Sequence, residues 1–291
     1  MKKRSGSVLL CAAVMMLCLS ACGSQTGTGS AAETGTETGT ESEGGTVSSN
    51  RDTFFQVSLL QGLTFGDYYG SVSVKELKLK GDTGLGTFDG LDGEMIMLDG
   101  SVYKAKGDGT VELADDSEMI PFCGITFLDE DITWSVENTE TYNQLIDILN
   151  QKVEENGKNR FYAARIAGRF SEMNVRSEYA QEEPYKPLAK VLETDQTFYD
   201  YSDIDGTIVA LYCPPYMSDL NASGWHLHFI SDDKTKGGHV LGLHIEKANI
   251  ALDLTDSFEM KLPDNEMFSG FDLTIDQSED IKKVETDVDR K

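Results

Sequence analysis

The sequence predicts a mostly β protein of the α+β class, with one or two helices. Residues 84–114 alternate apolar and polar positions between repeated Asp-Gly pairs, and such pairs are strong signals for β-hairpins. Residues 225–230, WHLHFI, alternate in the same way, as a strand does. Residues 141–156 instead place apolar side chains at helical spacing, with a threonine at the start and a glycine just after the end.

The remaining elements follow from local pattern. Residues 57–66 favour a short helix, after which the chain returns to strands. Residues 159–180 predict one long strand or two short ones. Composition changes at residues 181–187, QEEPYKP, which predicts a linker between a lobe of residues 51–180 and a lobe of residues 181–291.

The chain begins with the pattern of a bacterial signal peptide, expected to span residues 1–21. Three basic residues precede an apolar stretch, residues 7–20, that is too short to span a membrane. Residues 19–22, Leu-Ser-Ala-Cys, resemble a bacterial lipobox, which implies cleavage before Cys22 and a lipid anchor on it. The protein is then expected on the outer face of the cell membrane. Ordinary secretion is the alternative.

Residues 22–50 are rich in Gly, Ser, Thr and Glu and contain no aromatic residue, so a flexible tether is expected. The chain has 25 basic and 50 acidic residues and a net charge of −25, which argues against nucleic acid and against anionic lipid as partners of the protein surface. Cys123 and Cys213 are the cysteines that follow Cys22. They can pair outside the cytoplasm or remain two buried thiols, and their spacing leaves both possibilities open.

Histidine is concentrated in one predicted hairpin. The chain has four histidines, and three lie in residues 224–240, GWHLHFISDDKTKGGHV. Alternation along a strand puts His226 and His228 on one face. A polar loop ending in two glycines precedes His239 on the returning strand, whereas His244 has the opposite parity. The pattern therefore predicts that three imidazoles converge and that the fourth points away.

Three neutral imidazoles with an open coordination position suit a catalytic site of the zinc type. Asp232 and Asp233, in the same segment, are alternative ligands for a hard cation. Lys234 and Lys236 lie beside them, and a solvated turn is the better interpretation. The sequence contains no glycine-rich nucleotide fingerprint, so nothing in it indicates a nucleotide cofactor.

The histidine segment, extended to GWHLHFISDDKTKGGHVLGLHIEKANIALD, resembles the signature of bacterial alpha-acetolactate decarboxylases. Further segments are similar to those of this family and stand in the same order, so that the resemblance covers essentially the whole chain after the tether. These segments are FFQVSLLQGLTFGDYYGSVSVKEL, GLGTFDGLDGEMIMLDG, PFCGITFL, FYAARIAGRF, QEEPYKPL and LPDNEMFSGFDLTIDQSEDIKKVE.

The resemblance implies a fold and a metal. An N-terminal mixed β-sheet lobe with a helix would pair with a second subunit, giving a homodimer. A C-terminal barrel-like β lobe would carry a zinc ion on His226, His228 and His239.

The resemblance also implies two glutamates and an arginine around the metal. Glu94 matches the first glutamate, and Glu285 matches a glutamate near the chain end that folds back to the metal. Arg176 matches the arginine. The family segment there has the pattern T-R-x-V, whereas this chain has VRSE, and Arg165 is the competing arginine.

The implied reaction converts 2-acetolactate to acetoin and CO2. Zinc would act as Lewis acid and electron sink for an enediolate, without thiamine or pyridoxal. Arg176 would orient the substrate carboxylate, and Glu94 or Glu285 would handle the proton.

A cupin-type metal-dependent oxygenase is one alternative function, because an H-x-H pattern followed by Asp232 resembles the first cupin motif. However, Leu243 stands where the second motif needs asparagine. A non-catalytic metal-binding lipoprotein is the other alternative.

Overall fold

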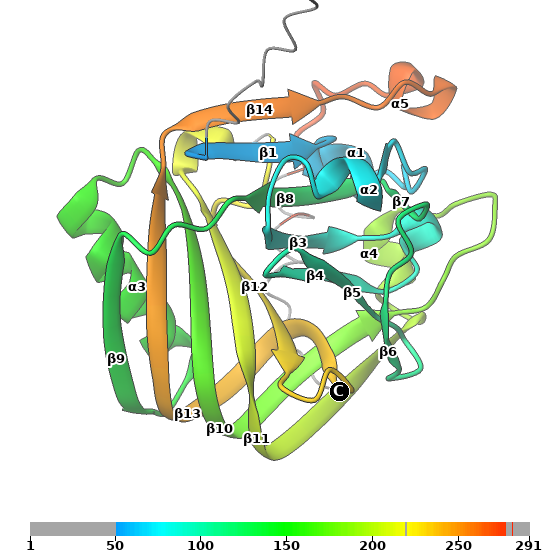
Figure 1. Cartoon of the computed structure of the whole chain (residues 1–291). Helices are drawn as coiled ribbons and strands as arrows, with labels where there is room; N and C mark the ends of the chain where they lie inside the picture. Colours follow the sequence, from blue (N-terminus) through cyan, green and yellow to red (C-terminus); the bar gives the residue numbers. More distant parts are fainter. Residues whose placement is uncertain (1–50, 219, 278–280, 282–291) are drawn as a thin grey trace, which may run out of the picture. The chain divides into compact units, whose positions relative to one another are not determined.

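Strands dominate the described part of the computed structural model, which comprises residues 51–218, 220–277 and 281 (Figure 1). The predictions for the signal peptide, Cys22, the tether and Glu285 fall outside these residues. Two main sheets are formed, as the α+β, mostly β prediction requires. None of the helices in these residues has the length and apolar character needed to cross a membrane.

Seven of the shorter strands form a mixed sheet. Its order is β14 (Ser257–Lys261), β1 (Thr53–Val57), β8 (Phe122–Thr126), β3 (Thr83–Thr87), β4 (Glu94–Leu98), β5 (Ser101–Ala105) and β6 (Val111–Leu113). Strands β14 and β1 run parallel, and the other neighbours run antiparallel. The Asp-Gly signal is confirmed between β4 and β5, where Asp99 and Gly100 both have positive φ (50° and 75°), as a tight hairpin turn requires.

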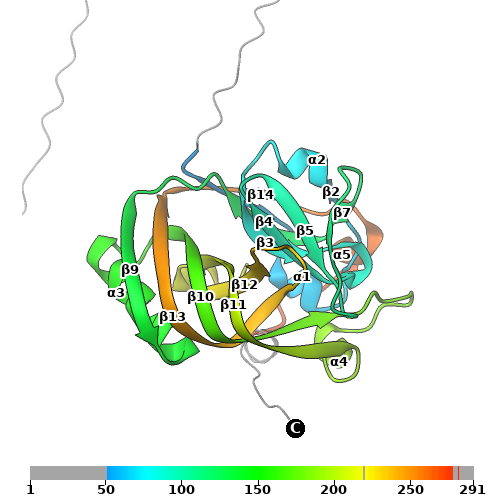
Figure 2. The same ribbon diagram turned by 60° about the horizontal axis from the view of Figure 1, so that its bottom comes forward.

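The second sheet has five strands and closes on itself. Its order is β10 (Phe161–Glu178), β11 (Gln196–Cys213), β12 (Gly224–Ser231), β13 (Gly237–Thr255) and β9 (Ile132–Thr139). Because β10 also pairs with β13, strands β10 to β13 form a closed ring, and the barrel-like prediction is confirmed (Figure 2). Register shifts between β10 and β13, between Arg169 and Val175, help these long strands to bend.

Five helices of the described residues, two 3-10 turns and one two-stranded pair complete the fold. They are α1 (Leu60–Thr64), β2 (Val72–Ser73), α2 (Val74–Leu77), β7 (Met119–Ile120), α3 (Tyr142–Asn156), α4 (Leu188–Val191) and α5 (Glu266–Gly270), with 3-10 turns η1 (Asp89–Leu91) and η2 (Pro215–Met217).

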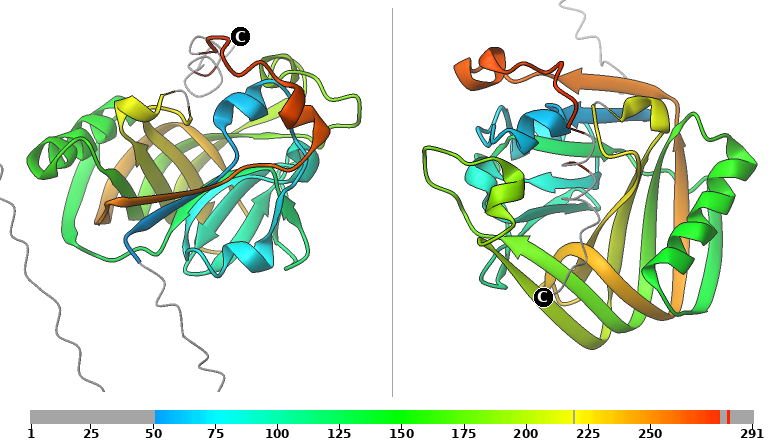
Figure 3. Two further views of the ribbon diagram at one scale, coloured as in Figure 1. Left: turned by 90° about the horizontal axis from the view of Figure 1, so that it is seen from above. Right: turned by 180° about the vertical axis from the view of Figure 1, so that it is seen from behind.

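The predicted helix at residues 141–156 is confirmed as α3. The Thr141 side chain caps it by accepting a hydrogen bond from the Gln144 amide, and Gly157 follows the last residue with φ of 109°. Leu145, Leu149 and Val153 pack against the face of the five-stranded sheet that also carries Leu227 and Phe229, and the helix lies in front of this sheet in the right-hand view of Figure 3.

Both faces of β12 are buried from Leu227 onward. Leu227 and Phe229 of β12 belong to the apolar cluster that includes α3. On the opposite face, Ile230 and Val209 pack with Ile96 of β4. The seven-stranded sheet therefore covers the face of β12 to which residues of even number point.

Sheet membership does not follow the predicted lobes. Strands β9 and β10 precede residue 180 yet belong to the five-stranded sheet, and β14 returns to the seven-stranded one. Residues 181–187, expected as a linker between lobes, instead lie between β10 and β11, which are paired neighbours in one sheet. Residues 181–187 do lie between regular elements, as their composition indicates, but composition does not show which distant strands pair with each other.

The two cysteines do not form a disulfide. Cys123 and Cys213 are free and buried. Burial raises the pKa of both thiols to about 12, so they behave as small apolar side chains.

A stack of phenylalanines joins the two sheets, and its loss is expected to destabilise the fold. Phe54 of β1 stacks on Phe161 of β10 with ring centroids 4.7 Å apart. Phe54→Ala is expected to lower the free energy of unfolding by about 3–5 kcal/mol, because it leaves a cavity between the sheets. Denaturant unfolding followed by circular dichroism measures this loss. Phe198→Ala is the matched control, since Phe198 is 41% exposed, and equal losses in both variants would contradict the expectation.

Candidate metal centre and pocket

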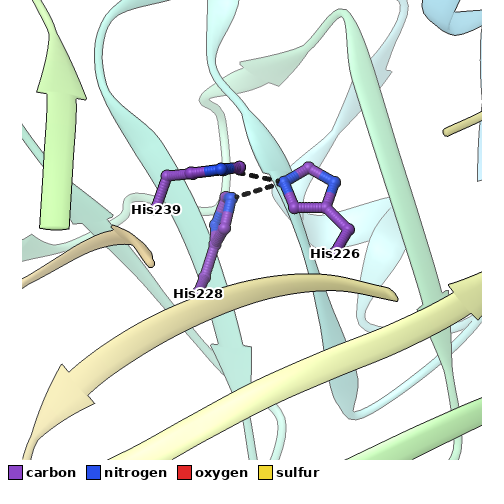
Figure 4. A group of neighbouring side chains, drawn as sticks. All are labelled: His226, His228 and His239. Carbon is purple, nitrogen blue, oxygen red and sulfur yellow. Dashed lines mark hydrogen bonds between the residues drawn. The ribbon is translucent and has the colours of Figure 1, made fainter. Parts of the chain in front are cut away.

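Three histidine rings converge between the two sheets (Figure 4). His226 Nε2 lies 3.1 Å from His228 Nε2 and 3.0 Å from His239 Nδ1. His228 and His239 are direct cross-strand partners in the β12–β13 hairpin, and His226 precedes His228 by one period of the strand. The predicted convergence is confirmed, and His244 is not a member of the group.

The spacing of these nitrogen atoms suits a metal ion. Ligand nitrogens around a tetrahedral zinc ion, at bond lengths of about 2.0–2.1 Å, are about 3.3 Å apart. The three ring nitrogens all lie within 4.8 Å of one another, and no other such group of possible ligands occurs in the described residues. The donor set therefore fits a divalent metal that accepts imidazole, although it does not identify the metal.

A backbone carbonyl fixes the orientation of His228. Its Nδ1–H donates a hydrogen bond to the Met95 carbonyl of β4, at 2.8 Å. This hydrogen bond leaves the Nε2 lone pair directed at the other two rings, as a metal ligand requires. Because Met95 belongs to the other sheet, the metal centre depends on how the two sheets pack.

The surroundings keep two of the rings, His226 and His228, neutral. Burial, together with the positive charge of Arg176, lowers the pKa of His226 to about 3. Burial also lowers the pKa of His228 well below its usual value, and the neighbouring His226 and Arg176 act in the same direction. Neutral imidazoles are the form that binds metal, so these rings do not need to lose a proton near pH 7.

Glu94 reaches the histidines from the seven-stranded sheet. It is the first residue of β4 and is buried, and its Oε2 lies 3.3 Å from His228 Nε2. The structure thus brings the first predicted glutamate to the metal centre. A carboxylate at this distance can act as a further ligand or hold a proton beside the metal.

Arg176 approaches from β10. It is the cross-strand partner of His239, and its buried side chain shares the pocket with His226 and Glu94. The competing Arg165 points elsewhere, since its guanidinium binds Asp99 and Glu130 at the surface. Of the two arginines, Arg176 lines the pocket and Arg165 does not.

Glu178 was not predicted as a site residue. It lies two residues after Arg176 on the same face of β10, and its Oε1 is 3.7 Å from Arg176 Nε. It falls where VRSE departs from the family pattern T-R-x-V. That departure was the one signal in the sequence that could have drawn attention to Glu178, but it did not show that the side chain is buried in the pocket.

Apolar side chains close the pocket around these polar groups. They come from α1, η1, β8 and α4 and from the residue that follows α4. The apolar lining consists of Leu60, Leu63, Leu91, Phe122, Leu188 and Leu192. A pocket of this composition, with a few convergent polar groups, is typical of a small-molecule site.

The alternative ligands in the hairpin do not take part. Asp232 and Asp233 lie in the exposed turn, where Asp233 accepts hydrogen bonds from Ser231 and Thr235. The interpretation of this segment as a solvated turn is confirmed. Glu285, the second predicted glutamate, remains a prediction because it lies outside the described residues.

Known proteins resemble this chain over most of its length. The sequence profile of the alpha-acetolactate decarboxylase family matches residues 54–275. The alpha-acetolactate decarboxylase of Methanosarcina mazei is 38% identical over 240 residues, which are 82% of each chain. That of Brevibacillus brevis is 35% identical over 81% of this chain and 82% of its own. The crystal structure of the Bacillus subtilis strain 168 enzyme has a TM-score of 0.77 at 32% identity, over 80% of this chain and 99% of that chain.

Removing one imidazole is expected to weaken metal binding strongly. His228→Ala should weaken zinc affinity by at least about 100-fold, because loss even of a ligand's outer hydrogen-bond partner costs about 10–100-fold. Competition with a fluorescent zinc chelator measures the affinity. His244→Ala is the matched control and should bind zinc as the wild type does. Equal affinities for both variants would contradict the assignment of the ligands.

Proposed function

The chain belongs to the alpha-acetolactate decarboxylase family of carboxy-lyases, and on this basis we propose that it converts 2-acetolactate to acetoin and CO2 at a zinc ion held by His226, His228 and His239. The observation that carries the proposal is the convergence of three imidazoles, two of them buried, beside a pocket that Glu94 and Arg176 also line. Neither the three histidines alone nor the apolar pocket alone would select this reaction.

Decarboxylation requires a group that accepts the electron pair of the broken carbon–carbon bond. The bond from C2 to the carboxylate carbon breaks, CO2 leaves as a neutral molecule, and the electron pair passes to the neighbouring ketone to give an enediolate. A zinc ion bound by the histidines would supply Lewis-acid stabilisation for this developing charge. The pocket contains no candidate for a covalent electron sink among its lining residues, which are apolar, carboxylate, guanidinium, threonine, glycine and imidazole groups.

Arg176 is the group that recognises the leaving carboxylate. A guanidinium binds a carboxylate through parallel hydrogen bonds, which fixes its orientation as well as its position. Arg176 is buried and belongs to a strand, so little conformational entropy is lost when it binds. It thereby holds the scissile bond in one direction relative to the histidines.

Glu94 is the group that handles the proton. Protonation of the enediolate carbon completes acetoin, and a positioned carboxylic acid can deliver that proton to one face. Glu94 lies beside His228 at the end of the pocket. Glu285 remains the second candidate for this role.

The apolar lining excludes water from the reacting atoms. Leu60, Leu63 and Phe122 belong to one buried cluster with Leu91 and Leu188. With little water in the pocket, the charges of Arg176 and Glu94 act on the substrate with less screening.

The function is tested by one assay with a chelation step. The purified protein is expected to convert 2-acetolactate to acetoin, to lose this activity after treatment with a zinc chelator, and to regain it with added zinc. A non-catalytic metal-binding protein would bind zinc without producing acetoin, and a cupin-type oxygenase would consume O2. Absence of acetoin from the zinc-loaded protein would contradict the proposal.

Replacing Glu94 is expected to slow turnover without unfolding the protein. Glu94→Gln keeps the shape of the side chain but cannot give or take the proton, so kcat should fall by about 10²–10⁴-fold. Acetoin production over time measures kcat. Glu112→Gln, an exposed position on β6, is the matched control and should leave kcat unchanged. Near wild-type kcat in Glu94→Gln would exclude this role for Glu94.

A further inference from the structure

Glu178 is a buried carboxylate in the pocket that the reaction described above does not use. It is 4% exposed and lines the pocket together with Arg176, Glu94, His226 and His239. Its Oε1 lies 3.7 Å from Arg176 Nε, and its Oε2 has no hydrogen-bond partner among the described residues. A carboxylate in this position needs an explanation, because burying a charge is costly.

The contact between Glu178 and Arg176 follows from their positions on strand β10. Side chains two residues apart on a strand share a face, so Arg176 and Glu178 both point to the pocket. Arg176 is also the cross-strand partner of His239, and both side chains line the pocket together with Glu178. The pair is therefore part of the buried pocket lining rather than of the exposed surface.

The charge of Arg176 has opposite effects on two stages of decarboxylation. A full positive charge binds the substrate carboxylate and orients it. In the transition state, however, that negative charge is moving away from the carboxylate toward the ketone. A guanidinium that stabilises the carboxylate too strongly therefore stabilises the ground state more than the transition state, and this lowers kcat.

We propose that Glu178 is a positioning residue that acts through Arg176: its carboxylate holds the Nε side of the guanidinium and offsets part of its charge, so that Arg176 orients the substrate carboxylate without retaining it. This inference rests on the proposed decarboxylase function. It assigns Glu178 no contact with the reacting atoms. It explains why a second carboxylate is buried in a pocket that binds an anion.

The kinetic test uses Glu178→Gln, which removes the charge and keeps the shape. Without the offsetting charge, Arg176 should bind the substrate more tightly and release CO2 more slowly. We expect KM to fall about three- to tenfold and kcat to fall about tenfold. A purely structural role would instead raise KM, or lower thermal stability with KM and kcat unchanged, and either result would overturn the proposal.

A binding measurement gives a readout that does not depend on turnover. 2-Hydroxy-2-methylpropanoate has the carboxylate and the tertiary hydroxyl of the substrate but no ketone, so it cannot be decarboxylated. By calorimetry, zinc-loaded Glu178→Gln should bind this probe about threefold or more tightly than the wild type. Glu182→Gln, the same charge change at an exposed position, is the matched control and should bind as the wild type does. Equal affinity in all three proteins would overturn the proposal.

Different results would contradict the proposed decarboxylase function and the proposed role of Glu178. If the wild type does not decarboxylate 2-acetolactate, both the function and the role of Glu178 are wrong. If it does and Glu178→Gln leaves KM, kcat and probe affinity unchanged, only the role of Glu178 is wrong. Should Glu178→Gln not fold, Glu178→Asp retains the charge on a shorter side chain, and KM and kcat close to those of the wild type are expected. A raised KM in Glu178→Asp would overturn the proposal.

Discussion

One hydrogen bond connects the two sheets at the metal centre, and the arrangement of the site depends on it. The Nδ1–H of His228 donates to the Met95 carbonyl at 2.8 Å, which links β12 to β4. It fixes the tautomer of His228 and aims Nε2 at the other two imidazoles. The same contact brings Glu94, the residue before Met95, to 3.3 Å from that ring. Ligand geometry and the position of the carboxylate are therefore set together by the packing of the sheets.

The second constraint is the balance of charge in a pocket with little water. Neutral imidazoles, two carboxylates and one guanidinium share an apolar enclosure, in which their interactions are weakly screened. Arg176 contributes to the low pKa of His226 on one side and contacts Glu178 on the other. The two residues thus relate to the charge of Arg176 in opposite ways: the charge helps to keep His226 of β12 neutral, whereas the carboxylate of Glu178, on the same strand as Arg176, offsets the charge.

The sequence identified the elements whose causes are local. The helix α3 was visible because its cap and its apolar spacing lie within sixteen residues, and the hairpin between β4 and β5 was visible from Asp99 and Gly100. The division at residue 180 did not match the sheets, because β9, β10 and β14 pair with strands far away in the chain. Glu178 was missed for a related reason, since its burial is produced by α1, α4 and β3, which surround the end of β10 only in the folded protein.

The sequence by itself determined which histidines converge. Alternation along a strand is a property of the backbone, so His226 and His228 had to share a face, and the short hairpin had to bring His239 opposite them. The resemblance to a family added Glu94 and Arg176 by position. Only the tertiary structure decided what the histidine face meets, because β12 is buried on both faces and periodicity cannot tell these faces apart. Packing against β4 turned three ligands on one strand pair into a pocket with an acid, a cation and a second carboxylate.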